Sequence, residues 1–144
     1  LYVRDGGDRI RMQAVQSNQA IRRVAPIGAR LPLNVGASSK VLIAFADRDV
    51  QEEVLEALEW SGEAEKSSFV KQLAEIRRLG YATSVEEREP GAAAVSAPIF
   101  NRSHKLVAAL AASGPSNRLT LESMREHASL VIEAANRMGK MLMK

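Results

Sequence analysis

The chain has 144 residues, of which 46% are hydrophobic and 26% charged, and it contains no cysteine. The length fits one domain, and this composition excludes a disordered, collagen-like or disulfide-stapled protein, as well as thiolate catalysis, zinc–thiolate sites and iron–sulfur clusters. The formal net charge of +3 comes from basic residues scattered among acidic ones, which indicates a solvated surface rather than a nucleic-acid interface.

The first third of the chain alternates apolar and polar residues, a pattern typical of strands. It predicts strands over residues 1–4, 9–16 and 21–27, a turn over 5–8, and an extended segment over 31–34 that Pro32 keeps from being helical. No apolar run reaches the ~20 residues that span a bilayer, and the start is not a signal peptide. With no cysteine present, we expect a cytoplasmic protein without membrane contact. Because the first residue is not Met, we also expect a piece of a longer chain.

The middle of the chain changes to helical spacing. Gly36 opens a short apolar helix over residues 37–45, with Ser38 and Ser39 in its first turn. A second helix follows a capping-box pattern that begins at Asp49, and a third helix ends at Gly80. The apolar faces of these two helices carry Val50, Val54, Leu55, Leu58, Val70, Leu73, Ile76 and Leu79.

The last third predicts three strands and a long helix. The strands cover residues 81–84, 92–100 and 106–113, and Gly114-Pro115 ends the last of them. Thr120 is expected to cap the helix, whose apolar face carries Leu121, Met124, Ala128, Val131, Ile132, Ala135, Met138 and Leu142. Strands, then helices, then strands and a helix predict one α+β domain over residues 1–144, built on an antiparallel sheet.

The last two strands have a small side and a bulky side, because alternate residues face opposite sides of a sheet. The small side carries Ala92, Ala94, Ser96, Ala109, Ala111 and Ser113, and the bulky side carries Val95, Ile99, Leu106, Ala108 and Leu110. The small side can hold either a closely packed helix or a concave ligand space. The helix start over 36–39 favours the ligand, because unpaired N–H groups and the helix dipole attract a carboxylate or phosphate and the serine hydroxyls can add hydrogen bonds.

A series of motifs resembles one known family. Residues 31–45 (LPLNVGASSKVLIAF) resemble the signature helix of the C-terminal effector-binding domain of IclR-type bacterial transcription regulators, and residues 76–82, 86–87, 91, 97–100 and 112–115 continue the resemblance in order. The resemblance implies a GAF-like α/β sensor, with an antiparallel sheet of about six strands and helices on both sides. It also implies a separate N-terminal winged helix-turn-helix domain, absent from this chain, through which alone the protein would contact DNA.

The resemblance implies a ligand pocket at the matching positions Leu31, Ala37, Ser38, Ser84, Ala92, Ala94, Ala111 and Ser113. Some relatives have an acidic residue at or beside position 84 and bulkier residues at 92 and 94, so the smaller walls here allow an acid larger than two or three carbons, aromatic acids included. The implied function is a sensor of a small organic acid, without enzyme activity, cofactor or metal. Such a sensor self-associates as a dimer or tetramer, and Trp60 is one candidate contact.

Two other functions stay open on the residues alone. An enzyme would need a base and a nucleophile, but His104 is expected in a turn and His127 on a helix, without a nucleophile elbow. A metal site joining His127 to Glu122 or Glu126 lacks the clustered spacing of a strong motif. A stand-alone GAF-type signalling module is distinguished from a regulator's sensor only by a winged helix upstream in the full gene.

Overall fold

The computed structural model describes residues 1–13, 28–33, 35–87 and 89–142. In these ranges the strands are β1 (Tyr2–Asp5), β2 (Asp8–Arg11), β3 (Arg30–Pro32), β4 (Ala82–Val85), β5 (Ala92–Phe100) and β6 (Leu106–Pro115). The helices are α1 (Ala37–Ala44), α2 (Arg48–Ala57), α3 (Glu63–Leu79) and α4 (Leu121–Met141). None of these helices is long and apolar enough to cross a membrane.

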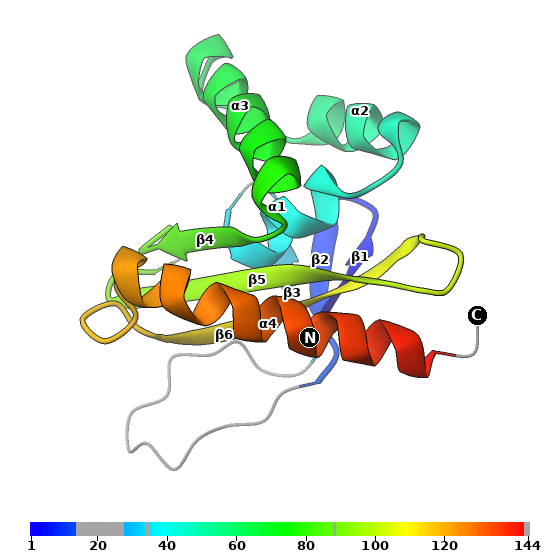
Figure 1. Ribbon diagram of the computed structural model, residues 1–144. Helices are drawn as coiled ribbons and strands as arrows, with labels where there is room; N and C mark the ends of the chain where they lie inside the picture. The colour runs from blue at the N-terminus through cyan, green and yellow to red at the C-terminus, as the bar shows by residue number, and fades with distance from the viewer. Residues whose placement is uncertain (14–27, 34, 88, 143–144) are drawn as a thin grey trace.

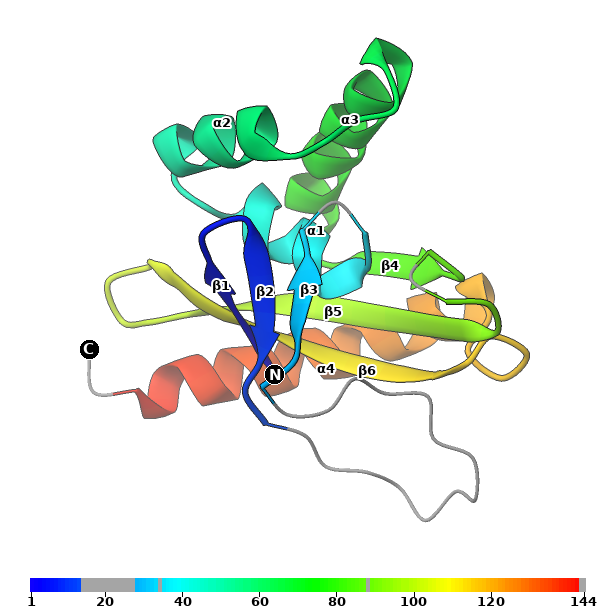
Figure 2. The ribbon, with the colours of Figure 1, turned by 180° about the vertical axis from the view of Figure 1, so that it is seen from behind.

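The strands form one antiparallel sheet in the order β3-β2-β1-β6-β5-β4. β5 and β6 pair along nearly their whole length, whereas β1 and β6 share only the register pair Tyr2 and Ala109. The sheet curls at this narrow junction, and Figure 2 shows β1–β3 crossing β4–β6 at a steep angle. The predicted α+β class and the sheet of about six antiparallel strands are confirmed.

Helices cover both faces of the sheet, as the family resemblance implied. α4 lies along one face of β5 and β6, while α1 lies on the other face, from which α2 and α3 project (Figure 1). Val95 and Ile99 of β5 pack under α4 together with Met124 of that helix. All eight residues of α1 are buried, because the helix is enclosed by the sheet and α3. The apolar helix predicted over 37–45 is therefore the central element of the core.

Three predicted helix ends are confirmed by backbone geometry. Gly36 is the N-cap of α1 with φ 93°, and Gly80 ends α3 with φ 86°. Both values lie in the region that glycine adopts without steric cost. Thr120 caps α4, because its hydroxyl accepts a hydrogen bond from the N–H of Ser123 at 3.2 Å.

Several predicted boundaries are wrong. The N-cap of α2 is Asp47, not Asp49. Asp49 lies inside the first turn, where its negative charge interacts favourably with the helix dipole. β2 is described to Arg11, whereas the predicted strand ran to residue 16. Residues 14–16 of that strand and the whole predicted strand over 21–27 lie outside the described residues. β6 continues to Pro115, which pairs with Ala92 at the end of the ladder, where a strand tolerates proline.

A β-bulge moves one core residue to the opposite face. Ile99 pairs with Ala108 but Phe100 pairs with Leu106, so Val107 is an extra residue in β6. Leu106 therefore packs against the core around α1. The prediction that Leu106 shares the bulky side with Ala108 is wrong, because strict alternation fails at a bulge.

Helical spacing overestimates the buried faces of the longer helices. On α3 the buried residues are Phe69, Leu73 and Ile76, and on α4 they are Met124, Ala128, Val131, Ala135 and Gly139. The exposed members of the predicted apolar faces are Val70, Leu79, Leu121, Met138 and Leu142. The buried stripe on each helix is therefore narrower than helical spacing alone predicts.

Candidate functional site

The sheet face that carries α1 gathers the small side chains of the candidate site. Tyr2 pairs with Ala109, and both residues belong to the core around α1, which fixes the orientation of the face. Cross-strand partners and alternate residues point to the same side of a sheet. This face therefore carries Leu31, Arg9, Arg11, Tyr2, Arg4, Ala109, Ala111, Ser113, Ala92, Ala94, Ser96, Ala82 and Ser84. The prediction that the small residues of β5 and β6 share one face is confirmed.

The eight predicted site residues lie on this face or in the first turn of α1. Those on the face are Leu31, Ser84, Ala92, Ala94, Ala111 and Ser113, and those in α1 are Ala37 and Ser38. Ser84, Ala94 and Ser113 form one cross-strand row. Leu31 lies in the other half of the curled sheet, beyond the junction of β1 and β6. The structure thus brings α1 against the strands β4, β5 and β6, which carry five of the predicted residues, and leaves Leu31 apart on β3. A role in ligand binding stays a prediction for all eight.

The Ser38 hydroxyl is already engaged inside the protein. Its Oγ lies 3.0 Å from Oγ of Ser96, and the Ser96 hydroxyl donates to the carbonyl of Leu110 at 3.0 Å. Because the Ser96 hydrogen points to Leu110, Ser38 donates to Ser96 and has no hydroxyl hydrogen left for a ligand. The donors that this helix end offers are instead the backbone N–H groups of residues such as Ala37 and Ser38, which lack partners within a helix.

Arg9 is a charged residue at this site that sequence reasoning missed. Its side chain is 4% exposed, and a Cβ on Gly36 would lie 2.6 Å from its Nη1 and 2.8 Å from its Nη2. The guanidinium also lies over the ring of Tyr2, with Cζ 4.8 Å from the ring centroid. Glycine at position 36 therefore lets a positive side chain approach the positive end of α1. The only sequence signal was the alternation of Arg9, Ile10 and Arg11.

A buried lysine and an acidic loop residue close the same helix end. The Nζ of Lys40, whose side chain is 3% exposed, donates to the Glu87 carboxylate at 2.6 Å and to the Thr83 carbonyl at 2.9 Å. The other oxygen of Glu87 accepts the N–H of Gly36 at 3.2 Å. Glu87 thus holds the loop between β4 and β5 against α1, and its charge is balanced by Lys40.

Nearly the whole chain matches one protein-family model. A family model described as Bacterial transcriptional regulator IclR C-terminal matches residues 1–140. The chain belongs to this IclR family. The resemblance found in the sequence motifs is confirmed. Since the family and the matched relatives are transcriptional regulators, the expectation of a non-enzymatic protein is confirmed as well.

Individual IclR-family relatives support the same assignment. The HTH-type transcriptional regulator KdgR of Escherichia coli K12 is 30% identical over 130 residues, which cover 87% of this chain and 49% of KdgR. The crystal structure of the Thermotoga maritima IclR is 28% identical with a TM-score of 0.82, covering 94% of this chain and 57% of that one. A PobR inducer binding domain from Acinetobacter is 26% identical with a TM-score of 0.81, covering 98% and 86%. The chain spans about half the length of the curated relatives it matches.

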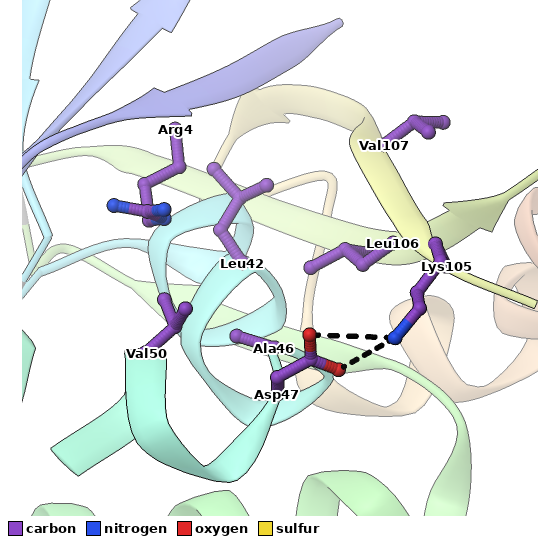
Figure 3. Close-up of a pocket in the computed structure, with 8 residues that line it drawn as sticks. All are labelled: Arg4, Leu42, Ala46, Asp47, Val50, Lys105, Leu106 and Val107. Carbon is purple, nitrogen blue, oxygen red and sulfur yellow. Dashed lines mark hydrogen bonds and ion pairs between the residues drawn. The ribbon is translucent and has the colours of Figure 1, made fainter.

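Two surface cavities of this IclR-family domain lie away from the eight predicted residues. A cavity of about 300 Å³ is lined by Arg4, Leu42, Ala46, Asp47, Val50, Lys105, Leu106 and Val107 (Figure 3). A second, of about 290 Å³, is lined by Val35, Trp60, Glu65, Ser68, Phe69, Gln72 and Glu87. In the first cavity Lys105 lies 3.5 Å from both carboxylate oxygens of Asp47, and Arg4 donates to the Gly6 carbonyl. These charges are exposed and partnered, so we place the candidate site at the buried positive end of α1.

The remaining polar and aromatic candidates have local partners. His104 is exposed in its turn, and the ring Nδ1 of His127, on the exposed side of α4, lies 2.7 Å from the carbonyl of Ser123. No group of three or more His, Cys, Asp or Glu residues that could hold a metal ion occurs among the residues described. Trp60 is half-buried, donates to the Leu55 carbonyl at 3.0 Å and packs on a ring of α3. Trp60 is therefore only partly accessible, and its role as a self-association contact stays a prediction.

Proposed function

We propose that this domain senses a small organic acid, aromatic carboxylates included, on the α1 face of its sheet. The observation that carries the proposal is the meeting of two positive groups at Gly36, the Arg9 guanidinium and the N-terminus of α1. A carboxylate at that point would lie beside the Arg9 guanidinium and accept hydrogen bonds from the N–H groups of Ala37 and Ser38. The neighbouring small residues, such as Ala94, leave room for the body of the acid.

A related structure supports the choice of ligand class. A double mutant of the PobR inducer binding domain, 26% identical to this chain, has been crystallised in complex with 3-hydroxybenzoic acid. A sensor of this fold and similar sequence therefore accommodates an aromatic acid. We expect the alanines on the α1 face of the present chain to make room for a body of that size.

Enlarging Ala94 tests the proposal. Ala94 is half-buried on the α1 face, so Ala94→Leu should fill the ligand space and abolish binding of the acid that most raises the melting temperature in a thermal-shift panel. The free domain should keep its stability, since an open space accepts the larger side chain. Calorimetric titration measures the affinity, and the melting temperature measures the stability.

The control is Ala112→Leu, because Ala112 is exposed and its alternation in β6 turns it to the opposite face. This variant should bind as the unchanged chain does. Unchanged binding by Ala94→Leu would contradict the proposed site. So would a loss of ~1–3 kcal/mol in its ligand-free stability, the cost of overpacking a filled core.

We further propose how the domain, taken as residues 1–144, serves the full-length protein. It would act in the cytoplasm, self-associate as a dimer or tetramer, and pass its ligand state to a separate N-terminal DNA-binding domain. The family of regulators and the greater length of the relatives support this arrangement. Symmetric association suits regulators that bind paired half-sites. The candidate contacts are Leu130 and Met141 of α4, which are 61% and 81% exposed.

A further inference from the structure

The cavity of about 290 Å³ lies where four separate segments of the chain meet. Its lining residues come from the segment before α1, the connection between α2 and α3, the helix α3 and the loop after β4. Its volume is near the lower limit of the range for small-molecule sites. The described lining residues include none of the eight residues predicted to bind the acid. A ligand in this cavity would therefore be a second one.

Two aromatic rings form one wall of this cavity. Trp60 and Phe69 both line it, with their ring centroids 5.1 Å apart and their planes inclined at 53°. Phe69 is buried, whereas Trp60 is half-buried and its indole N–H donates to the Leu55 carbonyl at 3.0 Å. That hydrogen bond holds the Trp60 ring in place and uses its only donor. The open part of the ring therefore offers a ligand an apolar, electron-rich surface.

The charged groups among the described lining residues are carboxylates. Glu65 and Glu87 line the cavity, and no Lys or Arg accompanies them in that described set. Lys40 balances the charge of Glu87 from inside the protein, whereas Glu65 forms no ion pair with any described residue. Hydrogen bonds from the side chain and the N–H of Ser61 lower the pKa of Glu65 below its ordinary value. Glu65 is therefore a fixed negative charge at the edge of the aromatic wall.

The surrounding surface adds to this negative charge. Residues 47–66, which contain α2 and the start of α3, hold eight Asp or Glu and two Arg or Lys, although the chain as a whole has a net charge of +3. An excess of one sign of charge over a region raises the local concentration of ions of the opposite sign. Trp60 lies within this stretch, so the aromatic wall lies in a region that attracts cations.

We infer that this cavity binds a small methylated ammonium ion. The methyl groups would contact the rings of Trp60 and Phe69 while the positive charge lies near Glu65, so the ring face and the carboxylate attract the same charge. A primary ammonium ion fits less well, because it needs several hydrogen-bond acceptors to replace its water. The inference goes beyond the proposed function, since it concerns a different cavity and a ligand of opposite charge.

Choline and its uncharged analogue dimethylbutanol, in which a carbon atom replaces the nitrogen, test this inference. Trp60 is the only tryptophan of the chain, so its fluorescence reports on this cavity. Choline chloride, exchanged for sodium chloride at constant ionic strength, should cause a saturable change in Trp60 emission at millimolar concentration. The alcohol should bind roughly three- to thirtyfold more weakly, which is the range that a cation–π contact accounts for.

Two variants separate the cavity from the general charge of its surroundings. Glu65→Gln should weaken choline binding roughly two- to fivefold, as expected for an exposed charge pair, and leave binding of the alcohol unchanged. Glu63→Gln removes an equal charge from the same helix, but Glu63 is an exposed residue that does not line the cavity. This control should bind choline as the unchanged chain does.

The inference would be overturned by no saturable change with choline, by equal affinity for choline and the alcohol, or by equal weakening in the two variants. Trp60 emission that changes with protein concentration in the absence of choline would assign the cavity to a contact between two copies of the chain, and would also overturn it. Each of these results leaves the acid sensor standing, because none of the experiments uses an acid or alters the start of α1.

Discussion

At the scale of single residues, buried charges organise the end of α1. Lys40 is held by a side chain and a carbonyl from two different segments, Glu87 and Thr83. Arg9 reaches the same helix end from β2. In the sequence these residues are ordinary charges with nothing that marks them for burial. Each of them acts on a partner more than 25 positions away in the sequence. The site residues implied by the resemblance therefore included the small side chains but none of these charged residues.

Replacing Lys40 tests the energetic weight of this cluster. Lys40→Met should lower the free energy of unfolding by roughly 2–3 kcal/mol, because it leaves the Thr83 carbonyl and the Glu87 carboxylate without their cation. This is below the full cost of breaking a buried pair, since the Glu87 side chain is 34% exposed and water can solvate it. Urea unfolding measures the change.

The milder variant Glu87→Gln serves as the control for Lys40→Met. Its single amide oxygen can accept from the Gly36 N–H or from Lys40 but cannot replace both carboxylate oxygens. Because one of these hydrogen bonds and the Thr83 contact of Lys40 remain, the loss should be about 1 kcal/mol. Equal stability of Lys40→Met and the unchanged chain would show that the ion pair does not hold the loop.

At the scale of elements, local signals predicted what depends on neighbours in sequence. Gly36, Gly80 and Thr120 mark helix ends through their own backbone and hydroxyl chemistry, and all three are confirmed. The bulge at Val107 and the start of α2 were missed, because the pairing register of strands and the direction of the chain after α1 are set by tertiary packing. The alternation of small and bulky residues in β5 and β6 identified the face of small side chains correctly, except at Leu106, which lies beyond the bulge.

The crossing of α4 over β5 depends on a glycine. A Cβ on Gly139 would lie 2.2 Å from the carbonyl oxygen of Phe100, a backbone atom that cannot move aside. Gly139→Ala should therefore destabilise the domain by roughly 2–3 kcal/mol, as overpacking does, although alanine is the better helix former. Thermal unfolding measures this, and Gly114→Ala is the control, since a Cβ there meets nothing within 4 Å. An unchanged or raised melting temperature for Gly139→Ala would contradict the close crossing.

At the scale of the whole molecule, the curl of the sheet creates the candidate site. Only one register pair joins β1 to β6, so the two halves of the sheet turn toward each other around α1 (Figure 2). Arg9 of β2 thereby reaches Gly36 at the start of α1. The family resemblance predicted the fold and the small residues. The position of Arg9 at the start of α1 became visible only in the three-dimensional arrangement, because strand order across the junction is not encoded in local pattern.

The central claim is that the α1 face binds an organic acid, and an NMR titration of the isotope-labelled chain with benzoate tests it most directly. The account predicts saturable shifts of backbone amide signals at millimolar benzoate, largest at Ala37 and Ser38 and extending to Ala94. Signals of Lys105 and Val107, which line the cavity of Figure 3, should stay unchanged. Absence of any saturable shift, or shifts confined to Lys105, Val107 and their neighbours, would contradict the account.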